Sequence, residues 1–155
     1  MNRRSPPDIA SSISYAESHC ADRGVKFTEK RKQVLTGLLE SKKALSAYEL
    51  TDYVREKFNS QLPAMSVYRI LDFLEEMDLV HRLDSAQKYV ACSHIACNHE
   101  HGLSQFLICR SCYLVEEISL GKGLMSSLKR SAEKAGFRLT NQELEFDSLC
   151  GNCSE

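Results

Sequence analysis

The chain has 155 residues, a formal net charge of −1 and 43% hydrophobic residues, which is the composition of a globular protein with one ordinary domain or two small ones. No apolar run is long enough for a transmembrane helix, and the first ten residues lack the apolar segment of a signal peptide. We therefore expect a cytoplasmic protein with no membrane partner, whose seven cysteines serve metal or redox chemistry rather than disulfides.

Charge is unevenly distributed along the chain. Residues 3–43 contain nine Lys and Arg against five Asp and Glu, whereas residues 83–155 contain seven against nine. The excess favours a basic N-terminal face, although a solvated helix surface has the same composition. The nearly neutral total charge by itself indicates no nucleic-acid partner.

Three helices are predicted in the first 60 residues. The first spans about residues 8–22 and ends at Gly24, the second follows an N-cap at Thr28, and the third begins at a capping box of Ser46 and Glu49. Apolar residues at helical spacing define their buried faces. These residues are Ile9, Ile13, Ala16, Cys20, Val34, Leu35, Leu38, Leu39, Leu50, Tyr53 and Val54.

A fourth helix and a hairpin complete the first half. The helix is expected over about residues 66–77, and two β-rich runs, 79–83 and 87–92, surround a polar turn. The predicted buried face of the helix consists of Val67, Ile70, Leu71, Leu74 and Met77. Short helices followed by a hairpin are typical of a winged helix-turn-helix, in which the helix before the wing enters the DNA major groove.

The outward side of this fourth helix carries residues suited to DNA. Ser66, Tyr68, Arg69 and Asp72 are expected to face outward near its N-terminal end. Arg69 can bind guanine or phosphate, and Tyr68 can contact either through its ring or its hydroxyl. The alternative is that Tyr68 packs on the flank of the helix and Arg69 is an ordinary surface charge.

Four of the seven cysteines form two Cys-x-x-Cys pairs. The first pair is Cys109 and Cys112, and the second is Cys150 and Cys153. Four thiolates at this spacing match a closed tetrahedral zinc site with Zn–S bonds of about 2.3 Å. Two disulfides or two redox dithiols are the alternative, but nothing in the sequence indicates secretion or a redox fold.

The second half is predicted to be a small α/β unit. Strands are expected at 105–108 and 113–118, a helix at 124–135 after two chain-breaking glycines, and a third strand made of 137–139 and 144–146. About 60 residues are marginal for an independent core, so zinc and a partner subunit would supply the missing stability. An exposed strand edge and an apolar helix face favour a homodimer.

A second metal site is predicted from the remaining ligand-type side chains. His81 and Cys92 lie on opposite arms of the hairpin, His99 and His101 lie in the polar stretch after it, and Glu117 follows the first cysteine pair. A set drawn from both halves would fix one half against the other. The alternative is ordinary: a lone histidine is usually a surface residue, and a lone cysteine a small apolar one.

Four stretches resemble the ferric uptake regulator family, most closely its zinc-sensing branch, the zinc uptake regulators. Residues 66–74 (SVYRILDFL) resemble its recognition-helix signature, usually begun Thr-Val-Tyr-Arg, and residues 79–82 (LVHR) follow at the expected distance. Residues 27–31 (FTEKR) resemble its Leu-Thr-x-x-Arg opening of the second helix, and residues 106–112 (FLICRSC) its Phe-x-Ile-Cys-x-x-Cys strand. The resemblance covers nearly the whole chain.

The resemblance implies an α+β protein with a winged-helix DNA-binding domain over residues 1–92, a hinge over 93–104, and a small α/β dimerisation domain with structural zinc over 105–155. It implies a homodimeric, zinc-responsive repressor of zinc uptake genes that binds palindromic double-stranded operator DNA and no small-molecule substrate. Two zinc ions per subunit would be bound. The implied structural ligands are Cys109, Cys112, Cys150 and Cys153, the regulatory ligands are His81, Cys92, His101 and Glu117, and the DNA-binding residues are Ser66, Tyr68, Arg69 and Arg31.

Cys92 favours zinc within this family, because a thiolate suits Zn²⁺ better than Fe²⁺ or Mn²⁺. An iron- or peroxide-sensing relative remains an alternative, as does a non-sensing module that binds DNA or protein. In the zinc-sensing branch the linker ligand often lies where this chain has Gly102, which cannot bind a metal through a side chain. A hinge can absorb one inserted residue, so we expect the neighbouring His101 in that role, with His99 next. Tyr113 follows the first pair where a glycine is common, so its turn must avoid a positive φ or tolerate strain.

An enzyme is the rival interpretation from a different class. A zinc deaminase needs His-x-Glu and Pro-Cys-x-x-Cys, with one metal position left to water. Here His99 and Glu100 are adjacent, no proline precedes Cys109, and four cysteines close the site. We therefore expect no enzymatic activity.

Overall fold

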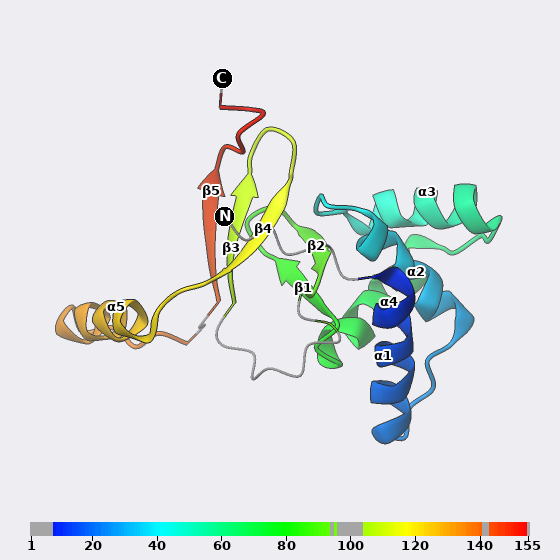
Figure 1. Ribbon diagram of the computed structural model, residues 1–155, viewed down its shortest axis with the longest axis horizontal. Helices are drawn as coiled ribbons and strands as arrows, with labels where there is room; N and C mark the ends of the chain where they lie inside the picture. Colours follow the sequence, from blue (N-terminus) through cyan, green and yellow to red (C-terminus); the bar gives the residue numbers. More distant parts are fainter. Residues whose placement is uncertain (1–7, 94, 96–103, 141–142, 155) are drawn as a thin grey trace. The chain divides into compact units, whose positions relative to one another are not determined.

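A computed structural model describes residues 8–93, 95, 104–140 and 143–154 of the chain. It divides the protein into two compact units, residues 1–98 and 99–155 (Figure 1). The first unit combines helices with a two-stranded hairpin, and the second combines a three-stranded sheet with one helix. None of the described helices is long and apolar enough to cross a lipid bilayer.

The helices of the first unit begin and end where local capping dictates. They are α1 (Ile9–Asp22), α2 (Glu29–Glu40), α3 (Ala47–Phe58) and α4 (Ala64–Glu76). The predicted caps are confirmed, because the Thr28 side chain accepts a hydrogen bond from the Arg31 N–H, and Ser46 and Glu49 form a reciprocal capping box. The Asp8 cap of α1 was not predicted. α4 starts two residues earlier than expected, directly after Pro63.

The apolar faces of these helices meet in one core, as predicted. Fully buried side chains come from all four helices: Ala16, Cys20, Val34, Leu35, Leu50, Val54, Val67, Leu71 and Leu74. Half-buried side chains pack around them: Ile9, Leu39, Tyr53 and Ile70. Burying one leucine side chain contributes about 1.5–3 kcal/mol, so this shared core is the main source of stability for the unit.

A close approach between α2 and α3 depends on one glycine. A Cβ atom added to Gly37 would lie 2.9 Å from the Tyr53 ring and 3.1 Å from the Leu50 side chain. Such distances are shorter than ordinary van der Waals contact, so Gly37 allows the two helices to pack at this spacing.

A tight turn connects α4 to the hairpin. Asp78 has a φ of 57°, and the N–H groups of Asp78 and Leu79 each donate to α4 carbonyls, those of Glu75 and Leu74, at 2.9 Å. This is a Schellman motif, which satisfies the last carbonyls of the helix. α4 and the hairpin are therefore joined without a flexible linker.

The predicted hairpin is confirmed. β1 (Val80–Leu83) pairs antiparallel with β2 (Lys88–Ala91), with Val80 opposite Ala91. A backbone bridge adds the segment before α3 to this sheet, because the N–H and carbonyl groups of Leu45 and Tyr89 are reciprocally bonded at 2.9 and 2.8 Å. The hairpin forms the wing of a winged helix-turn-helix.

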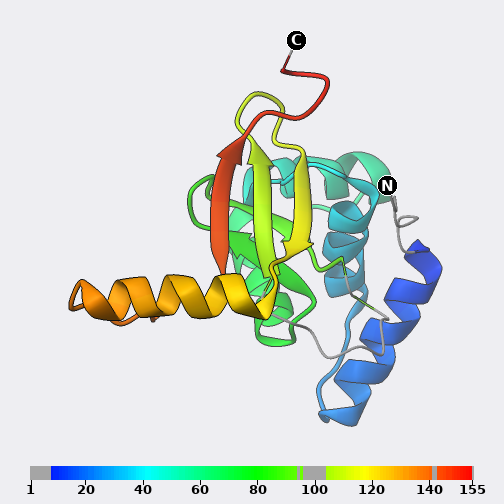
Figure 2. The same ribbon diagram turned by 60° about the vertical axis from the view of Figure 1, so that its left-hand side comes forward.

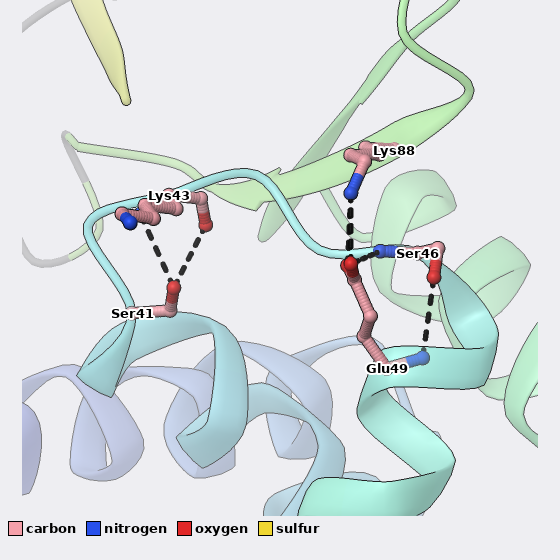
Figure 3. Close-up of polar contacts among 5 residues, drawn as sticks. All are labelled: Ser41, Lys43, Ser46, Glu49 and Lys88. Atoms are coloured by element: carbon pink, nitrogen blue, oxygen red, sulfur yellow. Dashed lines mark hydrogen bonds and ion pairs between the residues drawn. The ribbon is translucent and has the colours of Figure 1, made fainter. Parts of the chain in front are cut away.

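An ion pair also ties the wing to α3 (Figure 3). The Lys88 ammonium donates to the two carboxylate oxygens of Glu49 at 2.9 and 3.1 Å. One of these oxygens accepts the Ser46 N–H at 2.8 Å, while Ser41 closes the preceding loop through hydrogen bonds with the backbone of Lys43. Glu49 therefore caps α3 and holds β2 at the same time.

The second unit is a sheet of order β4-β3-β5 with one helix. Its elements are β3 (Ser104–Cys109), β4 (Val115–Ser119), α5 (Lys122–Lys134) and β5 (Leu144–Ser148). The central strand β3 pairs antiparallel with β4 and parallel with β5. Within this unit α5 extends away from the sheet (Figure 2), and none of its residues is buried.

Two predictions for this unit are wrong. Gly121 caps α5 and Gly123 lies within its first turn, so the glycines do not delay the helix to Leu124. Residues 137–140 form no strand, because the Phe137 N–H bonds to the Ala132 carbonyl at 2.9 Å and completes a Schellman motif around Gly136, which has a φ of 82°. Only the later part of the predicted third strand is a strand, β5.

Candidate metal centres and nucleic-acid interface

The four paired cysteines converge at one end of the sheet in the second unit. Cys109 ends β3 and lies opposite Ser148 of β5, so the turns that follow the two parallel strands leave the sheet at the same end. The sulfur atoms of Cys109, Cys112, Cys150 and Cys153 all lie within 4.8 Å of one another. Neighbouring sulfurs in a tetrahedral Zn–S₄ site are about 3.8 Å apart. The Cys112 and Cys150 sulfurs are 3.7 Å apart, so the group fits zinc.

Backbone dipoles and shared protons prepare these sulfurs for a cation. The N–H groups of Cys150 and Cys112 hydrogen-bond to the Cys109 sulfur and lower the pKa of that thiol to about 6. Hydrogen bonds to the Cys150 and Cys112 side chains raise the pKa of Cys153 to about 12. The group thus combines a thiolate with a thiol that shares its proton, a set that releases protons when it binds a divalent cation.

Tyr113 has a φ of 61°, so the turn after the first cysteine pair tolerates the left-handed conformation. Its N–H donates to the Cys109 carbonyl at 2.8 Å, and the Cys109 N–H donates to the Leu114 carbonyl at 2.8 Å. These bonds hold the tight turn around the two sulfurs. A left-handed conformation costs a non-glycine residue about 1–2 kcal/mol, which the turn must offset.

Two further ligand-type side chains meet on the wing. The Cys92 N–H bonds to the Leu79 carbonyl at 3.0 Å, which extends the β1–β2 register by one pair and places His81 and Cys92 diagonally on the same face. An imidazole nitrogen of His81 and the Cys92 sulfur lie within 4.8 Å of each other. Cys92 is buried and His81 is half-buried. One nitrogen and one sulfur are half of a tetrahedral zinc coordination shell.

The other two predicted regulatory ligands belong to different parts of the chain. Glu117 lies on β4 of the second unit, half-buried and opposite Phe106 of β3. His101 and its alternative His99 lie outside the described residues. The predicted four-ligand regulatory site therefore stays a prediction.

Three of the four predicted DNA-contacting side chains lie on the first half of α4. Arg69 is exposed, whereas Ser66 and Tyr68 are half-buried. Tyr68 meets the ring of Tyr48 edge-on, with 6.4 Å between the ring centroids. Among the described residues no side chain caps the first turn of α4, and the Ser66 and Val67 N–H groups there donate to the Pro63 carbonyl at 2.9 and 3.1 Å.

Arg31 has a different environment from the other three. Its guanidinium donates to the Lys26 carbonyl and lies 3.5 Å from the centroid of the Phe73 ring. Phe73 belongs to the second half of α4, so Arg31 connects the start of α2 to α4. Its predicted contact with DNA stays a prediction.

Some features of α3, α4 and the wing were not predicted. Tyr48 on α3 and Met65 on α4 are 66% and 65% exposed, although both are large hydrophobic residues. The Glu49–Lys88 ion pair joins residues 39 positions apart. The Ser-x-x-Glu signal identified the capping role of Glu49, but no local pattern could identify its partner on the wing.

The fold and the two groups of ligand-type residues define a class of protein: a winged helix-turn-helix joined to an α/β unit with a four-thiol site suited to zinc. A model of the ferric uptake regulator family matches residues 22–147 of the chain. The zinc uptake regulation protein of Escherichia coli (strain K12) is 36% identical over 143 residues, which cover 92% of this chain and 81% of that protein. The chain belongs to the ferric uptake regulator family.

Solved structures agree with this assignment. A zinc uptake regulator complexed with zinc and DNA has a TM-score of 0.78 and 34% identity, with 94% of each chain covered. The crystal structure of holo XcZur has a TM-score of 0.73 and 35% identity, covering 93% of this chain and 97% of that one. The family consists of transcriptional regulators, so the expectation that this protein is not an enzyme is confirmed.

Proposed function

We propose that this protein is a zinc-responsive, homodimeric transcriptional repressor that binds palindromic operator DNA and controls zinc uptake genes. One observation carries the proposal: the winged-helix unit has its own imidazole and thiol, those of His81 and Cys92, in addition to the four-thiol group of the second unit. The similarity to zinc uptake regulators, one of them solved with zinc and DNA, supports the same function. Such a repressor acts on chromosomal DNA, which implies the cytoplasm.

Each subunit would hold two zinc ions in different roles. Cys109, Cys112, Cys150 and Cys153 would form the structural site, because four sulfurs leave no position open for exchange. His81 and Cys92 would form the regulatory site together with His101 and Glu117. Zinc would supply a divalent positive charge to which a neutral imidazole, an anionic thiolate and an anionic carboxylate all donate electron pairs.

The regulatory residues would act by restricting the hinge. We take residues 1–92 as the DNA-binding domain, 93–104 as the hinge and 105–155 as the dimerisation domain. His81 and Cys92 are fixed to the wing, and the wing is joined to α4 through the turn at Asp78 and to α3 through Lys88. Ligands from beyond the hinge would therefore fix the angle of the recognition helix.

The recognition helix would read DNA through polar and aromatic side chains of its first half. Arg69 would bind guanine or phosphate, Tyr68 would pack on the bases or backbone, and Ser66 would bind phosphate near the uncapped N–H groups of the first turn. A homodimer would place two such helices on half-sites about 34 Å apart. The exposed apolar side chains of the second unit would supply the dimer interface: Leu124, Leu128, Phe137, Phe146 and Leu149.

Operator affinity measured across buffered free zinc tests this function. The probe is a labelled duplex selected from a random pool by the zinc-loaded protein. We expect zinc to tighten DNA binding by about 5- to 150-fold, and the DNA to tighten zinc binding equally, since coupling between sites is reciprocal. Equal affinities with and without zinc would reject the sensor. His81→Ala should leave a folded dimer with only its structural zinc and without this response.

Metal analysis distinguishes the remaining relatives. An iron- or peroxide-sensing protein would couple DNA binding to Fe²⁺ or Mn²⁺ instead of Zn²⁺. Cys92 argues against this outcome, because a buried thiolate favours zinc over these metals. A Cys92→Asp variant should shift the metal preference toward Fe²⁺ or Mn²⁺, measured as the free-metal concentration at half-maximal operator binding.

A further inference from the structure

Arg31 touches the recognition helix directly. Its guanidinium lies 3.5 Å from the centroid of the Phe73 ring on α4, and one of its N–H groups donates to the Lys26 carbonyl in the loop before α2. Both Arg31 and Phe73 are half-buried, and Phe73 packs against the helical core. A guanidinium over an aromatic face is an attractive contact that becomes stronger when it is shielded from water.

Phe73 occupies a particular position on α4. It follows Arg69 by four residues, and residues four apart lie on the same face of a helix, one turn from each other. The Arg31–Phe73 contact therefore fixes the same face of α4 that carries Arg69 toward DNA. The hydrogen bond to Lys26 ties the same guanidinium to the loop between α1 and α2.

The geometry points to Arg31 as a positioning residue: it sets the orientation of the recognition helix by stacking on Phe73, and it does not bind phosphate itself. This inference rests on the proposed function, since orientation matters only for a protein that reads DNA through α4. It replaces direct DNA contact as the role of Arg31. A positioned helix binds more tightly because a larger fraction of the protein is competent to bind.

Four variants test this inference with the selected duplex and saturating zinc. Arg31→Gln removes the charge and the stack, Phe73→Leu removes only the ring, Phe73→Tyr keeps a ring, and the double variant combines the first two. Lys32→Gln is the matched control: it makes the same charge change one residue further along α2, where Lys32 pairs only weakly with Glu17 at 3.8 Å. Stoichiometric titration gives the active fraction of each variant.

We expect Arg31→Gln and Phe73→Leu each to weaken operator binding by about 2- to 30-fold, the range that corresponds to a cation–π contact of 0.5–2 kcal/mol. The double variant should be no weaker than the weaker single variant, because both remove one contact. Phe73→Tyr and Lys32→Gln should bind like the wild type. The fraction that can be titrated with duplex should stay unchanged, because molecules with a misplaced α4 still bind once the duplex shifts their equilibrium, whereas irreversibly misfolded protein would lower it.

Salt dependence gives the decisive measurement. A lost phosphate contact lowers the slope of log affinity against log salt by about 0.9, whereas a positioning residue leaves it unchanged. A lowered slope for Arg31→Gln, together with normal affinity for Phe73→Leu, would overturn the inference. Additive losses in the double variant, or normal affinity for both single variants, would also overturn it.

Amide hydrogen exchange in the DNA-free protein separates this inference from the proposed function. Arg31→Gln and Phe73→Leu should both speed exchange across residues 64–76, and Lys32→Gln should not. If the wild type does not bind DNA in response to zinc, the proposed function fails, but this exchange still decides whether Arg31 holds α4. Unchanged exchange in both variants would reject the positioning role.

Discussion

The two units of this protein are stabilised in different ways. In the first unit, helices α1 to α4 and the wing bury a continuous set of apolar side chains, many without any solvent exposure. In the second unit, the described buried side chains all belong to one strand, β3. They are Gln105, Phe106, Ile108 and Cys109. Leu124 and Phe137 of that unit are 58% and 71% exposed.

This difference shows what each unit requires. The first unit has enough apolar burial to fold through its own core. The second has about 57 residues, too few for a strong core, and its helix contributes no buried side chain. A metal crosslink between the ends of β3 and β5 and a partner subunit are the usual remedies for such a domain.

The largest effect is expected from breaking the crosslink. Cys109→Ser should remove one zinc per chain and unfold the second unit while the first stays folded, because zinc binding and folding of such a site are linked. Limited proteolysis and metal analysis would show both changes. Ser111→Ala, in the same turn, should keep zinc and fold. A fully folded Cys109→Ser dimer with unchanged zinc would break the comparison between the units.

Truncating a leucine should affect a different property in each unit, the free energy of unfolding in the first and dimerisation in the second. Leu35→Ala, in the core of the first unit, should lower the free energy of unfolding by about 2–5 kcal/mol. Leu128→Ala, 37% exposed on α5, should change it by about 0.5 kcal/mol or less and weaken dimerisation instead. Denaturant unfolding and sedimentation measure the two effects. Equal losses of unfolding free energy would mean that α5 is packed within its own subunit.

A smaller loss is expected from filling the contact between α2 and α3. Gly37→Ala adds a methyl group 2.9 Å from the Tyr53 ring, which should cost about 1–3 kcal/mol by overpacking. Alanine favours the helix by about 1 kcal/mol over glycine, so the measured loss should be partly offset. Denaturant unfolding of Gly37→Ala should show a net loss, and Gly37→Ala combined with Tyr53→Leu should recover part of it. A stabilised single variant would show that the ring moves freely.

The smallest effect concerns the wing clamp and depends on pH. Burial opposes ionisation of Glu49, but the Ser46 N–H and the Lys88 ammonium outweigh it and lower the pKa below its ordinary value of 4.5. The stabilisation is therefore complete near neutral pH and is lost as the pH falls below 4.5 through the folded-state value. Glu49→Gln should cost about 1 kcal/mol or less at pH 7, since the pair is partly exposed, and nothing in strong acid. Unfolding midpoints of the wild type and of Glu49→Gln at several pH values measure this difference. In a Lys88→Met background the difference should be smaller, because the contribution of the ion pair is then missing.

Local chemistry explains which features could be predicted from the sequence. The caps at Thr28 and Ser46, the hairpin and the two cysteine pairs involve residues within one or two turns of each other, and all are present. The strand expected at 137–139 is absent because the Phe137 N–H closes the end of α5, a use that hydrophobic alternation does not reveal.

Contacts between distant segments could not be predicted. The Lys88–Glu49 pair and the Arg31–Phe73 stack join residues about 40 positions apart, and each depends on how the helices pack. The signature that includes Arg31 predicts a contact with DNA, and it does not reveal the contact of the Arg31 guanidinium with Phe73 of α4. Sequence patterns thus predicted where the recognition helix lies, but not which side chain of α2 stacks on it.

The parallel pairing of β3 with β5 has a consequence for synthesis. Gln105 and its strand partner Leu144 are 39 residues apart, and the Gln105 side chain accepts the Leu144 N–H at 2.7 Å. On the ribosome, β3 and β4 emerge early, and one side of β3 stays without its neighbour until Leu144 to Cys153 have been translated. Until then the free side of β3 can pair with a wrong strand. Zinc binding by the second Cys-x-x-Cys pair would hold β5 beside β3 and end this exposure.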